Sequence, residues 1–414
     1  EIASCLVGSE MCIRDSKKDA EELSCGFEGK KRFLLFILTL VVMALPLRAE
    51  GIAFFHGTWQ ETLAKAKSEN KLVFVDFYTQ WCGPCLNMAQ TVFVLPEVGA
   101  FYNANFVSAK IDTENGEGIE LAKKYGVRSF PTYVFIDPAT GEAVHRSSSR
   151  QTEEQFIATG KAALTPTQRS FYLIEEYNKG NREPQLLIDY IRYNHSIYQR
   201  KAVEEAFDAL IAGGAKLTDQ NIWDLFVEVI SGMDNKYVQQ VSKEYSLFCQ
   251  TFGKKAVDAK LVKETMYGDV ALLDSMCDFE GKAFNRKMIE VSKLVYSKQY
   301  DKAAAELDAL IADPTVDQQE LIQRMKFLVR VPRGYKSVPA TWFYKSVEYL
   351  RYIAYNQTDR DDANIHQEYA AALEELLRNL PDKTQVPAVL LTAPKYGKKG
   401  YSMRPDVLKP KPKH

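Results

Sequence analysis

The sequence predicts an α/β domain followed by an all-α domain, and three observations carry this prediction. Segments of strand and helix character alternate over residues 52–164. Two cysteines in a C-x-x-C pattern stand where a buried strand gives way to a helix. Beyond residue 166 strand signals disappear, and to about residue 380 only segments with the period of an amphipathic helix follow one another.

Apolar patterns and turn residues place the elements of the first domain. Residues 72–77 form an apolar run with a single acid, Asp76, as expected for a central strand covered on both faces. β-Branched and aromatic residues indicate strands at 106–111 and 132–136, and a turn follows at 137–141. Helical patterns, the first preceded by Thr58 as a candidate N-cap, predict helices at 59–70, 86–91, 119–125 and 152–163.

The second domain, expected over residues 166–390, consists of predicted helices separated by short breaks. Residues 300–307 resemble the second helix of a tetratricopeptide-type hairpin, but no strict period of about 34 residues recurs. We therefore expect an irregular, solenoid-like stack of helical hairpins. The predicted helices lie at 171–177, 184–193, 201–212, 220–230, 237–252, 287–295, 302–311, 318–329, 342–355 and 365–380.

Aromatic residues are frequent in this second domain. Packing in the helical core explains them most simply, because aromatic side chains bury large areas. A concave surface that docks peptides near Cys82 is the functional alternative. The tyrosines concerned are Tyr172, Tyr177, Tyr190, Tyr193, Tyr237, Tyr245, Tyr344, Tyr349, Tyr352 and Tyr355.

The segment Trp81-Cys82-Gly83-Pro84-Cys85 carries the clearest chemical signal. At a helix N-terminus, unpaired N–H groups and the helix dipole favour a thiolate, so Cys82 becomes a usable nucleophile near neutral pH. Gly83 allows a partner chain to approach the backbone closely, and Pro84 suits the first helical turn because it lacks an N–H. The two cysteines can then cycle between a dithiol and a disulfide through a mixed disulfide.

Two other interpretations of the cysteine pair stay open. The cysteines could form a purely structural disulfide, or they could supply half of a zinc site. Zinc needs two more Cys or His ligands at a suitable spacing, and the nearest histidines, His56 and His145, stand alone. We therefore expect no metal.

Residues 54–164 resemble the thioredoxin superfamily. The resemblance rests on Phe74-Val75-Asp76-Phe77, the motif from Trp81 to Cys85, Lys110-Ile111-Asp112 and residues 125–132. Residues 91–98 are similar to periplasmic thioredoxin-like domains, such as the one that ends the transmembrane disulfide reductase. The resemblance implies a thioredoxin fold for the first domain.

The resemblance also implies a role for each catalytic residue. Cys82 would attack a client disulfide, and Cys85 would be more buried and would resolve the mixed disulfide. Asp76 would lie beneath Cys85 and exchange a proton with it, because burial raises the pKa of a carboxyl. The alternative for Asp76 is an acid that faces an edge or is satisfied by N–H groups.

A second set of residues would bind the substrate. Pro131 would be a cis-proline that faces the disulfide and shapes a groove for an extended chain. Phe130 stands where the family usually has a smaller residue, which leaves substrate preference open. Ser108 stands where thioredoxins often carry a lysine near the buried acid, and Lys110 on the same face of the strand would substitute. The substrate-binding residues are Trp81, Gly83, Pro84, Phe130 and Pro131.

The two ends of the chain are expected to lie outside the folded domains. Residues 1–29 resemble translated adapter sequence or a polar leader, and they are given no role. A basic start, an apolar run at 33–47 and Ala49 predict a signal peptide over residues 30–49, with an uncleaved membrane anchor as the alternative. Residues 391–414 form a basic, proline-rich tail that is expected to be disordered.

These observations predict an exported, periplasmic thiol:disulfide oxidoreductase. It would need no cofactor beyond the redox-active disulfide, and its partners would be disulfide-bearing clients and an upstream thiol reductant such as a membrane electron conduit. The net charge of -1 gives no reason to expect nucleic acid. The alternative is a binding or assembly protein in which the helical domain matters most and the thioredoxin module is ancillary. Outside the motif, Cys249 and Cys277 would be inert buried thiols or a structural bridge.

Overall fold

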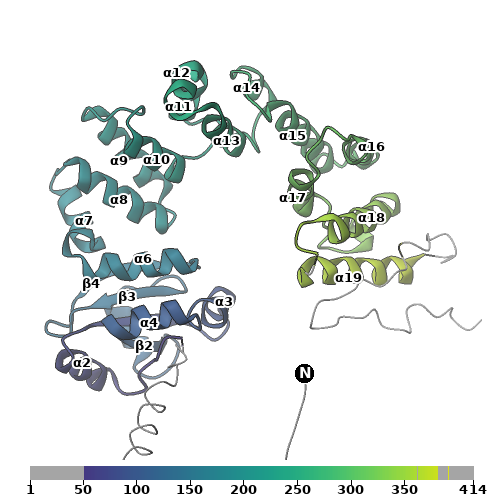
Figure 1. Cartoon of the computed structure of the whole chain (residues 1–414). Helices are drawn as coiled ribbons and strands as arrows, with labels where there is room; N and C mark the ends of the chain where they lie inside the picture. The colour runs from purple at the N-terminus through teal and green to yellow at the C-terminus, as the bar shows by residue number, and fades with distance from the viewer. Residues whose placement is uncertain (1–50, 361, 381–389, 391–414) are drawn as a thin grey trace, which may run out of the picture. The chain divides into compact units, whose positions relative to one another are not determined.

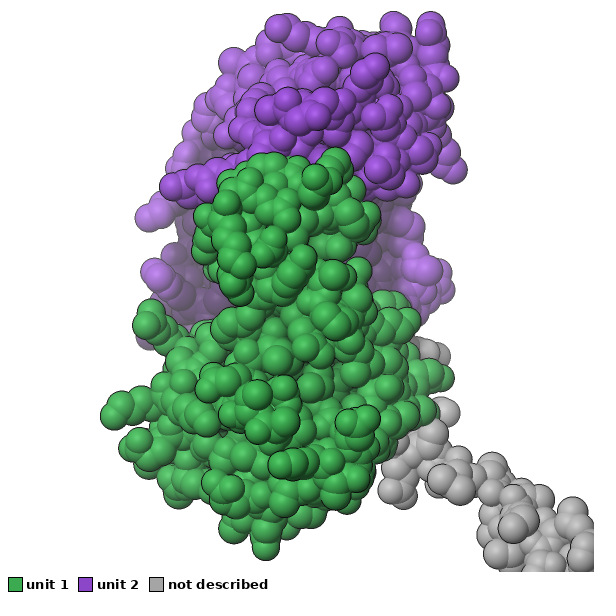
Figure 2. Space-filling model, turned by 90° about the vertical axis from the view of Figure 1, so that its left-hand side faces the viewer, with its two compact units in different colours: residues 1–199 green, residues 200–414 purple. Residues whose placement is uncertain are grey.

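The computed structural model describes residues 51–360, 362–380 and 390 (Figure 1). Figure 2 shows the two compact units into which the chain divides, residues 1–199 and residues 200–414. The predicted leader, signal peptide and basic tail lie outside the described residues. Within the described ranges, no helix is long and apolar enough to cross a membrane.

The first unit is built on a four-stranded mixed sheet with the strand order β2-β1-β3-β4. The central strand β1 (Leu72–Tyr78) runs parallel to β2 (Phe106–Asp112) and antiparallel to β3 (Thr132–Ile136). The edge strand β4 (Ala143–Ser148) pairs antiparallel with β3. Three of the four strands are therefore predicted from the sequence. Strand β4 was missed because half of its residues are charged or polar hydroxyl residues rather than apolar ones.

Helices cover both faces of this sheet (Figure 1). Helices α2 (Trp59–Ser68) and α5 (Gly118–Lys124) pack with the β1 residues Val73, Val75 and Phe77 on one face. The other face holds Phe74, Tyr133 and Phe135, and it is covered by α3 (Gly83–Thr91), α4 (Pro96–Asn105) and α6 (Glu153–Leu164). The predicted thioredoxin fold is confirmed.

One of these helices, α4, has no counterpart in the prediction. Its sequence contains Gly99 and two asparagines, which are weak helix formers. Burial of Val98 and Tyr102 against the sheet supplies the stability that local propensity lacks.

Two further helices, α7 (Ser170–Asn178) and α8 (Pro184–Ser196), belong to the first compact unit and follow the short turn η1 (Pro166–Gln168). Strand β4 holds the start of α7 by two hydrogen bonds. The backbone N–H of Ser170 donates to Nδ1 of the buried His145 at 2.9 Å. The Ser170 hydroxyl in turn accepts from the backbone N–H of Arg146 at 2.8 Å. The change of pattern at residue 166 therefore does not coincide with the end of this unit.

The second unit is entirely helical in its described residues, as predicted. Most helices that are neighbours in sequence pack against one another. Apolar residues recur every three or four positions, as Val203, Phe207 and Leu210 do in the first of these helices. The helices are α9 (Arg200–Ala212), α10 (Gln220–Val229), α11 (Lys236–Lys243), α12 (Tyr245–Phe252), α13 (Lys254–Glu264), α14 (Val270–Asp274), α15 (Lys282–Tyr296), α16 (Tyr300–Ala312), α17 (Gln318–Leu328), η2 (Tyr335–Ser337), α18 (Ala340–Asn356) and α19 (Ala363–Asn379).

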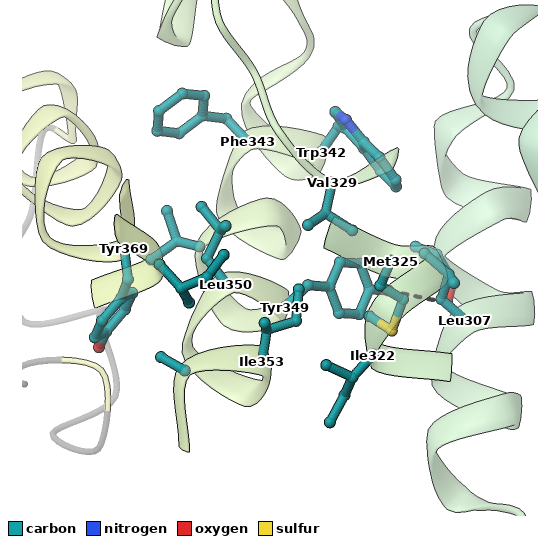
Figure 3. Packing of buried hydrophobic residues seen from close by; sticks show 14 of the residues in the cluster. Leu307, Ile322, Met325, Val329, Trp342, Phe343, Tyr349, Leu350, Ile353 and Tyr369 are labelled. Atoms are coloured by element: carbon teal, nitrogen blue, oxygen red, sulfur yellow. Dashed lines mark hydrogen bonds between the residues drawn. The ribbon is translucent and has the colours of Figure 1, made fainter. Parts of the chain in front are cut away.

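A large apolar cluster of the second unit joins α15 to α19. Figure 3 shows Tyr349 of α18 projecting toward Leu307 of α16, with Met325 of α17 beside its ring. The Tyr349 hydroxyl donates to the Ala304 carbonyl at 3.1 Å and to Asp308 Oδ1 at 3.0 Å. Its ring fills the core while its hydroxyl is satisfied at the edge of the cluster.

Helix α13 escaped prediction because two of its inward residues are charged. Lys260 and Glu264 lie one turn apart, and their side chains are almost completely buried. Lys260 Nζ donates to Glu264 Oε1 at 2.7 Å and to the Ile230 carbonyl at 2.5 Å, and Glu264 Oε2 accepts from the Gly232 N–H at 2.7 Å. This pair replaces the apolar residues by which a helix pattern is identified.

The tyrosines of the helical region serve mainly in packing. Of the ten named above, Tyr237 and Tyr349 are buried, Tyr172 is exposed, and the other seven are half-buried. The rings of Tyr177 and Tyr190, from α7 and α8, stack on each other at 4.1 Å. This distribution favours the packing interpretation.

Candidate active site

The two cysteines of the motif form a disulfide at the N-terminus of α3. Cys82 is the N-cap of this helix, and its Sγ accepts a hydrogen bond from the Cys85 N–H at 3.1 Å. Pro84 lies in the first turn, where a missing N–H leaves no bond unmade. The Cys82 N–H donates to the Thr79 carbonyl at 3.2 Å, which fixes the turn after β1. The predicted strand-to-helix setting of the motif is confirmed.

Both sulfur-bearing residues are enclosed in this disulfide state. Cys82 is 4% exposed and Cys85 is 2% exposed, so the difference in burial expected from the resemblance is slight here. Cys85 lies three residues before Met88, which packs among the side chains of the α3-covered sheet face. Residues three apart share one side of a helix, so Cys85 is turned toward that face.

Trp81 and Phe130 form an aromatic rim beside the cysteine motif. Trp81 is 70% exposed, and its ring meets the half-buried Phe130 ring edge-on at 5.9 Å. Glu114 accepts a hydrogen bond from Trp81 Nε1 at 3.0 Å, a contact that local sequence reasoning missed because it joins residues 33 apart. A Cβ placed on Gly83 would meet no heavy atom within 4 Å, so the space in front of the motif is open to another chain.

The peptide bond between Phe130 and Pro131 is cis. The contact between Phe130 and Trp81 brings this bond next to the cysteine motif. The structure therefore brings together the substrate-binding residues named from the sequence, and their role as a binding surface stays a prediction.

Asp76 lies in the middle of β1 with its side chain fully buried. Neither carboxyl oxygen has a hydrogen-bond partner among the described residues, so the alternative of an exposed or N–H-satisfied acid is wrong. Burial raises the pKa of Asp76 to about 6, although the charge of Lys110 acts in the opposite direction. At that pKa the carboxyl can both take up and release a proton near neutral pH.

The cation beside Asp76 is Lys110. Its Nζ lies 3.5 Å from Asp76 Oδ2, and 4.6 Å from the centre of the Tyr78 ring, while its side chain stays 27% exposed. Ser108 faces Phe74 in the strand register, whereas Lys110 faces Asp76. Lys110 is therefore the lysine beside the buried acid, as expected of the residue that would substitute for a lysine at Ser108.

The histidines considered for zinc lie apart from the cysteines. His145 is buried, and its Nδ1 already accepts from Ser170, whereas His56 is exposed. Among the described residues, no group of three or more His, Cys, Asp or Glu side chains is placed to hold a metal. Cys249 and Cys277 are free thiols of intermediate exposure in the second unit, so no bridge joins them in this structure.

Comparisons with known proteins agree with this geometry. Residues 59–164 match the family model of the thioredoxin-like domain. Thioredoxin-1 of Drosophila melanogaster is 44% identical over 69 residues, which are 17% of this chain and 60% of that protein. A thioredoxin-like protein of Synechocystis is 39% identical over 87 residues, which are 21% of this chain and 76% of that protein.

Among solved structures, a thioredoxin from Thermus thermophilus is similar, with 28% identity and a TM-score of 0.26. The alignment covers 28% of this chain and 90% of that one. Each of these alignments covers less than a third of this chain. The family-model match, at residues 59–164, lies within the first unit.

Proposed function

Because the chain belongs to the thioredoxin family, we propose that it is an exported thiol:disulfide oxidoreductase that reduces or interchanges disulfides in client proteins. The observation that carries the proposal is the Cys82–Cys85 disulfide at the start of α3, on the sheet face that buries Asp76. A structural disulfide alone would not need a buried carboxyl with a pKa near neutrality or an open aromatic rim.

The first step of the proposed cycle begins from the reduced pair. The Cys82 thiolate attacks one sulfur of a client disulfide, which forms a Cys82–client bond and breaks the client S–S bond. The departing client thiolate takes up a proton from solvent. The N-terminus of α3 favours the Cys82 thiolate because its N–H groups point toward the sulfur, as the Cys85 N–H does here.

The second step uses Cys85 and Asp76. The Asp76 carboxylate accepts the proton of the Cys85 thiol, and the resulting thiolate attacks Cys82 Sγ. The Cys82–Cys85 bond forms, the Cys82–client bond breaks, and the second client sulfur leaves as a thiolate that is then protonated. Two electrons have passed to the client, and an external dithiol must return them to the Cys82–Cys85 disulfide.

We assign the reducing direction on the basis of Gly83 and Pro84, since the Gly-Pro dipeptide matches reducing members of the family. The reduction potential of the Cys82–Cys85 pair, measured against glutathione, tests this direction. A potential as oxidising as that of DsbA, about −120 mV, would overturn the reductase assignment.

Insulin reduction by the full chain, with Cys82→Ser as the control, tests the activity itself. The chain should reduce insulin, and the Cys82→Ser variant should not. Equal rates for both proteins, or none for either, would favour the alternative of a binding or assembly protein with an ancillary thioredoxin module.

Export and partners complete the proposal. The signal-peptide pattern at 30–49 supports a periplasmic location, where a membrane electron conduit would serve as the upstream reductant. Sequencing of the mature N-terminus from fractionated cells tests this location. A mature chain that retains residues 30–49 in the cytoplasm would overturn it.

The helical residues are proposed to recruit clients. Cys85→Ser traps mixed disulfides, and the partners trapped by the full chain can be compared with those trapped by a chain that ends at residue 199. This end point keeps α7 and α8, which belong to the first compact unit. Identical sets of trapped partners would show that residues 200–414 do not select clients.

A further inference from the structure

Three residues in register form a row across the sheet, on the face covered by α3, α4 and α6. Asp76 of β1 pairs with Lys110 of β2 on one side and with Tyr133 of β3 on the other. Directly opposed residues of an antiparallel pair have Cβ atoms about 4.5–5.5 Å apart and project to the same face. The buried carboxyl therefore has an ammonium neighbour on one strand and a phenol neighbour on the other.

Packing does not explain the hydroxyl of Tyr133. The ring is fully buried and meets Phe156 at 5.2 Å and Phe93 at 6.2 Å, contacts that a phenylalanine would make equally well. Yet its Oη has no hydrogen-bond partner among the described residues. Tyr102, the other buried tyrosine of this face, donates to the Phe156 carbonyl at 2.8 Å. An unpaired buried hydroxyl costs stability, so the one on Tyr133 calls for another explanation.

Asp76, in turn, lacks hydrogen-bond donors to its carboxyl oxygens among the described residues. The buried hydroxyls of Ser108 on β2 and of Thr79, just after β1, likewise have no partner there. A phenol is a donor, and an ionised carboxylate accepts only. The unsatisfied donor and the unsatisfied acceptor thus lie side by side on neighbouring strands.

We propose that Tyr133 is a positioning residue of the redox cycle, whose hydroxyl donates a hydrogen bond to the ionised Asp76 carboxylate, directly or through one buried water. This inference rests on the proposed function, because Asp76 is the group that accepts the Cys85 proton. Tyr133 keeps its own proton throughout. Burial, and then the charge of Asp76, raise the pKa of the Tyr133 phenol far above its ordinary value, so it remains a donor over the working range.

The charged groups around Asp76 are placed differently from Tyr133. On the sheet, Lys110 Nζ stays 3.5 Å from Asp76 Oδ2 and lies over the Tyr78 ring, and Tyr78 itself is only partly buried and lies beside Asp112. The hydroxyl of Ser108 belongs to the register partner of Phe74, not of Asp76. Of the covering helices, α3 contributes Cys85 and no charged residue, and α4 contributes Tyr102, whose hydroxyl is already used. The charged residues of α4 and α6 lie outside the buried face: Glu97, Glu153, Glu154 and Lys161.

The test is Tyr133→Phe in the full chain, with Tyr102→Phe as the matched control. The readout is the titration of the Asp76 carboxyl in the oxidised protein, followed by carbon-13 NMR. A hydrogen bond to a charged group is strong enough that its loss should raise the pKa of Asp76 by about one unit. Tyr102→Phe should leave this titration unchanged, because Tyr102 donates to a backbone carbonyl.

Turnover supplies the second readout. In Tyr133→Phe the pH profile of insulin reduction should move to higher pH by the same amount, whereas a merely structural loss would lower the rate at every pH. An unchanged Asp76 titration in Tyr133→Phe, or an equal shift in Tyr102→Phe, would overturn the proposal. The carboxyl titration needs no client, so it decides the role of Tyr133 even if the chain fails to reduce insulin.

The wild-type protein provides an independent check. The ring-carbon resonance of Tyr133 should change over the pH range in which Asp76 titrates. If the Tyr133 resonance does not change over this pH range in the wild-type protein, the proposal is overturned.

Discussion

Each compact unit contains a buried charged site, and the two sites differ in whether their hydrogen bonds are made. In the second unit, Lys260 donates to Glu264 and to the carbonyls of Val227 and Ile230, and Glu264 accepts a backbone N–H in return. In the first unit, Lys110 Nζ lies 3.5 Å from Asp76 Oδ2, and the described residues make no hydrogen bond to either carboxyl oxygen.

This difference distinguishes a buried charge that stabilises the fold from one that can take part in proton transfer. A buried ion pair whose side-chain hydrogen bonds are made ties α13 to the end of α10. The buried Asp76 carboxyl has a pKa of about 6, so it can change its protonation state near neutral pH. Burial of charge alone is therefore no sign of function. At Asp76 the sign is the combination of a buried carboxyl, a pKa of about 6 and a disulfide on the same face of the sheet.

The largest effect is expected from breaking the satisfied pair. Lys260→Met leaves Glu264 buried without its cation and removes the donor to two carbonyls. It should destabilise the second unit by about 3–5 kcal/mol in urea unfolding of the full chain. Adding Glu264→Leu should recover most of that loss. A cost below about 1 kcal/mol for Lys260→Met would remove the contrast between the two units.

A buried histidine gives the next largest effect, and it appears in acid. Burial lowers the pKa of His145 to about 3, with the charge of Arg169 acting in the same direction. The unfolded chain, with a pKa of about 6.5, then binds more protons than the folded one below neutrality. His145 therefore contributes full stability above pH 6.5, and this contribution is lost as the pH falls toward 3.

The expected loss from His145 is about 2 kcal/mol between pH 6.5 and pH 4.5. Chemical unfolding of the full chain at the two pH values measures it, and His145→Gln should remove this part of the pH slope. The same slope in both proteins would contradict the assignment.

Asp76 should give a pH dependence of stability opposite to that of His145, and Asp76→Asn should remove it. The folded pKa of about 6 exceeds the unfolded value of about 3.9, so the wild type loses stability as the pH rises from 4 through 6. At pH 8 the variant should be more stable by about 2 kcal/mol, less than the full linkage because its amide is also unpaired. Turnover should fall, because an amide cannot accept the Cys85 proton. Normal rates at all pH values from about 6 to 9 would contradict the proton-transfer role.

The smallest effect is expected at an exposed pair. Lys287 Nζ lies 2.5 Å from Glu306 Oε2, but each side chain is 39% exposed. Lys287→Met should cost less than about 1 kcal/mol, since water and salt screen such pairs. If it cost as much as Lys260→Met, hydrogen-bond satisfaction in the core would not be the deciding factor.

Local sequence patterns correctly predicted the features that are determined by residues close together in the chain. The apolar run around Asp76 and the helix start at Cys82 are short-range features, and both lie where they were expected. Strand β4 and helix α13 escaped because tertiary partners, rather than their own patterns, bury their polar residues. The pairing of Asp76 with Lys110 and Tyr133 depends on strand register, which no single segment encodes.

The hydrogen bond from the Arg146 N–H to Ser170 has a consequence for solubility. β4 is the last strand in the sheet order, and the free backbone groups of such an edge are a template on which another chain can add a strand. The first residue of α7 occupies one of these groups, so this N–H is not available to pair with an added strand. A chain cut just before Ser170 would keep every residue of the disulfide site and still present an unguarded strand to its own copies.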